Sequence, residues 1–85
     1  MAYRVEIRPA AYRALESLSP SLQSRIAAKI DALAQNPYPP GVKKLAGAEK
    51  RLRIRVGDYR IVYDIQSEVL LILVIRIGHR REVYR

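Results

Sequence analysis

The sequence predicts an α+β fold in which a hairpin of two helices packs on one face of a largely antiparallel sheet, in the order βααβββ. Three observations predict this fold. Residues 3–7 alternate between apolar and charged side chains, residues 9–35 carry apolar side chains at helical spacing, and residues 51–77 hold three strand-like runs. The chain has 85 residues, which suits one small domain spanning residues 1–85.

The first strand and the first helix meet at a proline. Tyr3, Val5 and Ile7 alternate with charged residues, which predicts a strand with one buried face. Pro9 ends this strand and can open a helix, because proline is tolerated in a first helical turn. Apolar residues at helical spacing then continue to Leu18. We therefore expect a short helix directly after the strand.

The second helix has clear start and stop signals. Ser19 suits the N-cap and Pro20 the first helical position, while Asn36-Pro37 stops the helix. Its apolar stripe comprises Leu22, Ile26, Ile30 and Leu33. Residues 38–41 form a rigid connector, and we expect the basic stretch at residues 42–50 to be irregular.

The second half of the chain predicts three strands, at residues 51–56, 59–65 and 69–77. Gly57 and Asp58 form a two-residue turn that suits a primed geometry, so the first two strands form a hairpin. The third strand is almost wholly apolar, which is typical of a central strand covered on both faces. Gly78 is expected to end it.

The predicted hairpin places like charges opposite one another. If Val56 pairs with Tyr59, then Arg55 lies directly across from Arg60, with Arg53 two residues along on the same face, away from the helices. Like charges in opposing positions destabilise a sheet, so folding alone gives no reason for this arrangement. Because guanidinium groups bind phosphate oxygens in a bidentate manner, the hairpin is predicted to bind phosphate.

The charge of the whole chain agrees with an acidic partner. The formal net charge is +8, and residues 43–85 carry eleven basic and five acidic side chains. A basic surface can also serve solubility alone. The clustering of the charge around the hairpin and the tail favours nucleic acid instead.

Composition argues against several other classes. The chain has no cysteine, which excludes disulfides and thiolate metal sites, and one histidine with scattered carboxylates predicts neither a metal site nor a cofactor. The N-terminal residues lack the apolar core of a signal peptide, and the longest apolar run is too short to span a bilayer. We expect a cytoplasmic protein with no membrane partner.

Three segments together, residues 44–47, 52–63 and 74–84, resemble the RelE/ParE toxin superfamily, the toxin half of bacterial and archaeal toxin–antitoxin pairs. The resemblance implies a metal-independent endoribonuclease that cleaves mRNA, usually in the ribosomal A site. In such enzymes the RNA 2′-hydroxyl attacks the adjacent phosphorus and leaves a 2′,3′-cyclic phosphate and a 5′-hydroxyl. That chemistry needs a group to take the 2′-proton, cations for the phosphorane and an acid for the 5′-oxygen.

The resemblance also implies catalytic residues. Arg60 and Arg80 match the phosphate-binding arginines of the family. Arg53 and Arg55 fall on two strand positions that are lysines in RelE proper, and Tyr84 falls on a C-terminal tyrosine that works in proton transfer or base stacking.

The two arginines at lysine positions change the expected chemistry. Arginine, with a pKa above about 12, effectively cannot exchange protons, so Arg53 and Arg55 can stabilise charge but are poor acids. Proton transfer would then fall to His79 and Tyr84, since histidine suits this work near neutral pH. Two structural alternatives stay open: His79 as a turn residue and Tyr84 as a half-buried aromatic.

Further basic residues are predicted as generic, individually replaceable contacts to RNA phosphates: Lys43, Lys44, Lys50, Arg51 and Arg81. Arg76 is predicted to form an ion pair with a carboxylate such as Asp64. Tyr59 and Tyr63 share a face with Ile61 and are predicted to lie in the core or at its edge.

The resemblance implies partners as well: a small cognate antitoxin, mRNA on the ribosome, and operator DNA reached through the antitoxin. Acidic residues on the antitoxin would complement the charge of this chain. Two other functions remain open. One is a ParE-like inhibitor that binds DNA gyrase, which shares the fold without being a nuclease. The other is a non-catalytic homologue that only binds nucleic acid.

Overall fold

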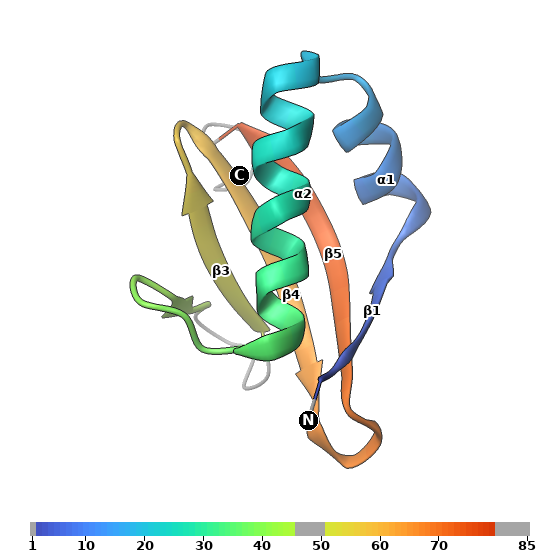
Figure 1. Ribbon diagram of the computed structural model, residues 1–85, viewed down its shortest axis with the longest axis vertical. Coiled ribbons are helices and arrows are strands. Elements are labelled where there is room, and N and C mark those ends of the chain that lie inside the picture. Colours follow the sequence, from blue (N-terminus) through green and yellow to red (C-terminus); the bar gives the residue numbers. More distant parts are fainter. Residues whose placement is uncertain (1, 46–50, 80–85) are drawn as a thin grey trace.

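Two helices lie across one face of a five-stranded sheet (Figure 1), so the predicted α+β class is confirmed. The structure is a computed structural model and describes residues 2–45 and 51–79. Its elements are β1 (Arg4–Ile7), α1 (Pro9–Glu16), α2 (Pro20–Gln35), β2 (Lys43–Lys44), β3 (Arg51–Val56), β4 (Tyr59–Gln66), the 3-10 helix η1 (Ser67–Val69) and β5 (Leu71–His79).

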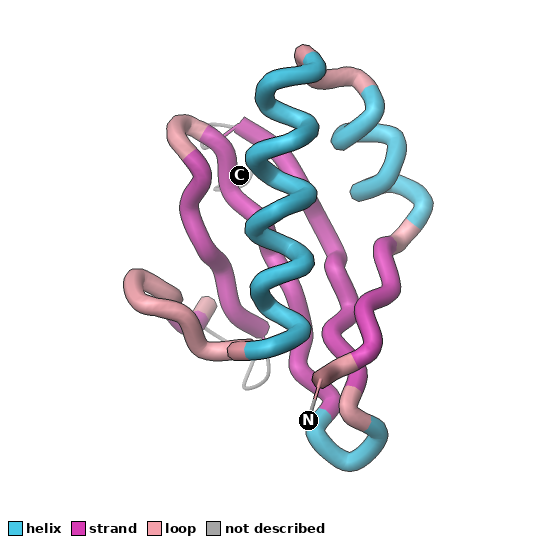
Figure 2. The backbone as a smooth tube through the Cα atoms, in the orientation of Figure 1, coloured by secondary structure: helices cyan, strands magenta, loops and turns pink. Residues whose placement is uncertain are grey.

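The strands are ordered β1-β5-β4-β3-β2 across the sheet. β1 pairs in parallel with β5, and every other pair is antiparallel. β2 lies within the stretch predicted to be irregular. The connector from α2 leads to the outer edge of β3, where Lys43 and Lys44 form this two-residue strand (Figure 2). Two residues are too few to show a strand periodicity in the sequence.

The core lies between the helices and the sheet, and the predicted apolar face of α2 contributes to it. Ile26, Ile30 and Leu33 of the stripe are buried, and Leu22 is half-buried. The largest fully buried side chains come from α2, β4 and β5: Tyr63, Ile26, Leu33, Ile61, Ile72 and Val74. β4 and β5 therefore form the centre of the packed layer.

Both ends of α2 are capped as the sequence predicts. Ser19 occupies the N-cap, and its hydroxyl accepts a hydrogen bond from the backbone N–H of Leu22 at 3.3 Å. Asn36 occupies the C-cap, and its side-chain oxygen accepts from the backbone N–H of Tyr38 at 3.1 Å. The second bond turns the chain sharply out of the helix and into the connector.

The last strand differs from its prediction at both ends. Val69 ends the 3-10 helix η1 instead of starting the strand, and Leu70 follows in the left-handed region with φ of 51°. β5 then runs through Gly78 to His79, so the expectation that Gly78 ends the strand was wrong. Gly78 pairs with Arg60 inside the sheet. β5 is central, as predicted, but the helices cover only one of its faces.

Neither helix in the described part of the chain is long and apolar enough to cross a membrane.

Tyr63 fixes the connector to the sheet. Its side chain is fully buried, and its hydroxyl donates a hydrogen bond of 2.7 Å to the carbonyl oxygen of Pro37. Burial raises the pKa of Tyr63 to about 12, and the nearby Tyr38 phenol contributes less to the same rise. The prediction that Tyr63 belongs to the core is therefore confirmed.

The raised pKa of Tyr63 predicts a loss of stability at high pH. The unfolded phenol ionises near pH 10, whereas the folded one keeps its proton until about 12, so unfolding releases a proton between these values. The free energy of unfolding should therefore fall as pH rises from about 10 towards 12. Tyr63→Phe should flatten this fall but cost about 1–3 kcal/mol at neutral pH, because the Pro37 carbonyl loses its donor.

Urea unfolding over this pH range measures the effect. Tyr12→Phe is the matched control, since Tyr12 is half-exposed and its variant should keep the wild-type pH dependence. Equal pH dependence in the wild type and the Tyr63 variant would show that another group is responsible.

Candidate functional site

The β3–β4 hairpin has the predicted register. Arg55 lies directly opposite Arg60, and Arg53 lies opposite Val62. Leu52 and Ile54, which alternate with these arginines, belong to the hydrophobic core. The arginines therefore lie on the face of the sheet that the helices do not cover, which we call the outer face. The convergence of like charges predicted from the sequence is confirmed.

The turn that sets this register depends on one glycine. Gly57 has φ of 59°, whereas Asp58 is not among the residues with positive φ, which is the pattern of a type II′ turn. A β-carbon at Gly57 would also meet the Arg25 guanidinium of α2 at 3.6 Å. This turn fixes the pairing register of β3 and β4. A shift of the register by one residue would place the arginines on the core face.

The three arginines share the outer face, but they differ in burial. Arg55 is exposed and Arg53 is half-buried, but Arg60 is only 4% exposed. Arg60 lies on β4, between β3 and β5, and its paired residue on β5 is Gly78.

These arginines line a pocket of about 300 Å³ on the outer face. Its described lining residues are Gly41, Lys43, Arg53, Ile54, Arg55 and Arg60. All four charged side chains in that set are cations. Lys43 pairs with Arg53, so β2 and the connector form one wall and the hairpin forms the other. Like charges at this spacing repel one another, and a bound oxyanion would relieve the repulsion.

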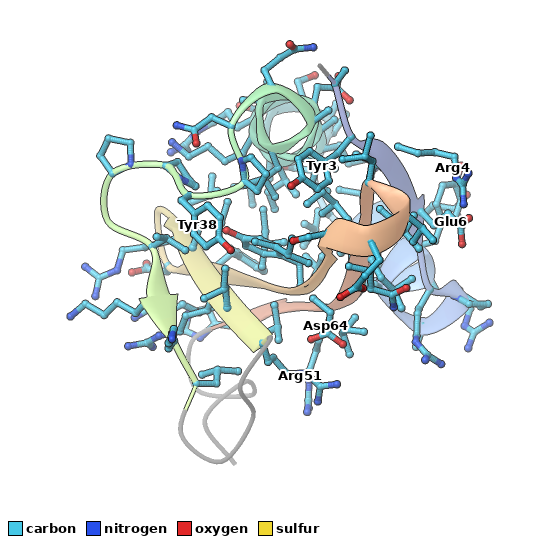
Figure 3. The ribbon with its side chains drawn as sticks, turned by 90° about the horizontal axis from the view of Figure 1, so that it is seen from below. Tyr3, Arg4, Glu6, Tyr38, Arg51 and Asp64 are labelled. Atoms are coloured by element: carbon cyan, nitrogen blue, oxygen red, sulfur yellow. The ribbon has the colours of Figure 1, made fainter. Side chains whose placement is uncertain are left out.

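Arg51 is held by a carboxylate outside this pocket. Its Nε and Nη2 atoms donate to Asp64 Oδ1 and Oδ2 at 3.0 and 3.2 Å, and both side chains lie on the outer face (Figure 3). The hydrogen bond to Asp64, followed by its charge, raises the pKa of Arg51. The sequence suggested Asp64 as one example of a carboxylate for Arg76, whereas the structure bonds Asp64 to Arg51. Arg51 is also the residue of β3 that lies opposite Asp64 in the strand pairing.

His79 lies on the opposite side of the sheet from the arginines. It pairs with Tyr59, and the two rings meet edge to face with centroids 5.6 Å apart and planes at 80°. Tyr59 packs against the core beneath the helices, as predicted. The structure therefore does not bring His79 to the pocket, nor does it place His79 in a turn, because β5 continues through it.

The remaining predicted RNA contacts divide into three groups. Lys43 lines the pocket, whereas Lys44 pairs with Leu52 and is not among the lining residues. Four predicted site residues lie outside the described part of the chain: Lys50, Arg80, Arg81 and Tyr84. Gly41 was missed as a site residue, although the Pro39-Pro40-Gly41 connector just before Lys43 was a signal for a fixed wall.

Comparisons with known proteins agree with this fold. Residues 5–84 match the family described as the ParE toxin of the parDE type II toxin–antitoxin system. A curated protein of Escherichia coli, whose name describes it as RelE-like, is 30% identical over 82 residues, covering 94% of this chain and 85% of that protein.

Solved structures match over nearly the whole chain. The archaeal RelE–RelB complex from Pyrococcus horikoshii OT3 contains a chain with a TM-score of 0.83 and 32% identity, covering 94% of this chain and 97% of that one. A mutant of the Escherichia coli toxin RelE in the free state has a TM-score of 0.82 and 25% identity, covering 99% and 92%.

Proposed function

This chain belongs to the ParE toxin family of type II toxin–antitoxin systems, within the RelE/ParE superfamily, and we propose that it is an endoribonuclease that cleaves mRNA on the ribosome. The observation that carries this proposal is the pocket on the outer face, where Arg55 lies opposite the buried Arg60. A phosphate group is the natural occupant of such a cluster, because arginine binds its oxygens in a bidentate manner.

In the proposed reaction the 2′-oxygen of one nucleotide attacks the adjacent phosphorus. A new P–O2′ bond forms while the P–O5′ bond breaks, which gives a 2′,3′-cyclic phosphate and a 5′-hydroxyl. The 2′-proton passes to a base, and the departing 5′-oxygen receives a proton from an acid. Negative charge grows on the phosphorane oxygens between these events, and fixed cations stabilise it without a metal ion.

The burial of each arginine suggests its role. Arg60, held between two neighbouring strands, is suited to bind a phosphorane oxygen because a packed side chain needs little reorganisation. Arg53 and the exposed Arg55 would bind the remaining oxygens as the substrate enters. Lys43 adds a fourth cation from the other wall.

Proton transfer needs a different group. Arginine keeps its charge, and His79 lies on the far side of the sheet, so neither serves the pocket as a base. Among the described charged side chains that line the pocket, Lys43 is the one able to release a proton. We propose that Lys43 shares this work with Tyr84, and that Arg80 adds a phosphate contact.

Placing a lysine in the hairpin tests whether proton transfer limits the reaction. Arg55→Lys should preserve the cleavage rate or raise it, because lysine keeps the charge and adds a group that can exchange a proton. Arg55→Ala should lower the rate, since it removes the cation. The measurement is single-turnover cleavage of ribosome-bound mRNA, with Arg13→Lys on the exposed surface of α1 as the control. A lysine variant as slow as the alanine variant would mean that the guanidinium geometry is required.

A cognate antitoxin follows from membership in the family, whose solved structures include RelE–RelB complexes. We propose that an acidic segment of this antitoxin covers the outer face, because the chain has a net charge of +8 and the pocket gathers cations. The complex would bind operator DNA through the antitoxin.

A second function is favoured by one specific observation, the match to the ParE toxin family. A ParE-like chain would inhibit DNA gyrase and leave RNA intact. Incubating the chain with ribosomes and mRNA, followed by mapping of the cut ends, tests the nuclease directly. Cut ends bearing a 2′,3′-cyclic phosphate support it. Intact mRNA together with inhibited supercoiling by gyrase would establish the second function.

A further inference from the structure

Lys43 reaches the pocket from a strand of only two residues. This strand, β2, lies at the edge of the sheet beside β3. So short a strand does little to fix its own position, because few ladder hydrogen bonds hold it. The position of Lys43 therefore depends on the chain that leads into β2, the connector of residues 36–42.

The first part of the connector is tied to the end of α2 and to the sheet. The backbone N–H of Tyr38 donates to Asn36 Oδ1 at 3.1 Å, and the hydroxyl of the fully buried Tyr63 donates to the Pro37 carbonyl oxygen at 2.7 Å. Pro37 is itself buried. The start of the connector is therefore fixed to the middle of the sheet, since Tyr63 lies on β4.

Residues 39–42 form a β-turn that ends the connector. The backbone N–H of Val42 donates to the Pro39 carbonyl oxygen at 3.2 Å, and Gly41 has φ of 87°. Proline at the second position, glycine with positive φ at the third and a hydrogen bond from the fourth residue to the first are the features of a type II turn. Because the ring of Pro40 fixes its own φ, Gly41 sets the direction in which the chain leaves the turn.

That direction decides which face Lys43 occupies. Val42 is half-buried and packs against the core, and Lys43 pairs with Arg53 on the outer face. Successive residues of an extended chain point to opposite sides, so the turn that seats Val42 on the core also presents Lys43 to the pocket. A β-carbon at Gly41 would meet no atom of the described residues within 4 Å. The turn therefore needs glycine for its backbone conformation and not for space.

We propose that Gly41 and Tyr63 are positioning residues for the cleavage reaction, and that they hold the Lys43 side chain at the pocket through the two ends of the connector. The inference rests on the proposed function, in which Lys43 transfers a proton. A group that transfers a proton must lie within hydrogen-bond distance of the substrate atom, so its contribution is sensitive to small displacements.

A double-mutant cycle on the full chain tests this role. Gly41→Ala should lower the single-turnover rate of mRNA cleavage at saturating toxin by roughly 10-fold or more, since a misplacement of about 1 Å can cost about 10²-fold. In a chain that also carries Lys43→Ala, the same change should cost less than about twofold, because the group that it positions is gone. Gly41→Asn is the matched control. Asparagine adopts the left-handed region more readily than alanine, so this variant should keep most of the rate.

Two further measurements keep the test independent of one variant and of cleavage itself. Tyr63→Phe should also lower the rate in the chain with Lys43 and cost little more in the chain with Lys43→Ala. Amide hydrogen exchange should become faster in β2 of the Gly41→Ala variant and stay unchanged in β5, because only the strand at the edge is released.

Equal losses from Gly41→Ala in the two Lys43 backgrounds would assign the turn to general stability and overturn the inference. A full cleavage rate in Gly41→Ala, or unchanged exchange in β2, would overturn it as well. If the wild type leaves ribosome-bound mRNA intact, the nuclease is refuted instead, and the exchange of β2 alone decides whether Gly41 fixes Lys43.

Discussion

Replacing Arg60 with alanine is expected to slow the cleavage of ribosome-bound mRNA by roughly 10²–10³-fold, the cost of losing one preorganised donor to a developing oxyanion. Arg60 is the most buried of the three arginines that line the pocket, and it lies opposite Arg55. Its charge is therefore fixed in place before the phosphorane forms. Single-turnover cleavage at saturating toxin separates this loss from weaker binding.

The control for this prediction addresses folding, because Arg60 is buried. Arg60→Lys keeps a cation at the position and should recover part of the rate, whereas Arg13→Ala on the surface of α1 should not change it. Thermal unfolding of each variant shows whether the sheet is intact. A well-folded Arg60→Ala variant that cleaves at the full rate would remove the pocket from the mechanism.

Truncating Ile61 to alanine is expected to lower the free energy of unfolding by about 2–5 kcal/mol, the usual cost of a cavity at a well-packed position. Ile61 is fully buried on β4, where it pairs with Ile54 on one side and Ile77 on the other. A loss of this size is a large part of the stability of a small domain. Denaturant unfolding at neutral pH measures it.

Val69→Ala provides the matched control, since Val69 is 57% exposed and should change stability by less than about 0.5 kcal/mol. A loss below about 1 kcal/mol for Ile61→Ala would contradict the assignment of β4 to the centre of the core. The variant also tests function at low temperature. Where Ile61→Ala is folded it should still cleave, because the residue faces away from the pocket.

The hairpin could be predicted from sequence because the residues that determine its register are close together in the chain. Alternation places Arg53 and Arg55 on one face, and the Gly57-Asp58 turn fixes which residues oppose each other. The same register also pairs Arg51 with Asp64, so the ion pair could have been predicted by counting back from the turn.

Other features could not be obtained from local patterns. The buried Arg60 pairs with Gly78 of β5 and lines a pocket with Gly41 of the connector, and both glycines are distant from it in sequence. The side taken by His79 is an intermediate case. Once β5 is known to continue past Gly78, alternation from the buried Ile77 places His79 on the helix side. The strand end therefore decides on which face of the sheet His79 lies.

The alternation along β3 has a consequence for how this fold can evolve. Leu52, Ile54 and Val56 belong to the core, while the residues between them form the outer face. Mutations at the outer positions can change what the protein binds while selection for folding acts on the inner ones. Different toxin activities could in this way diverge on one scaffold through substitutions at alternate positions of a single strand.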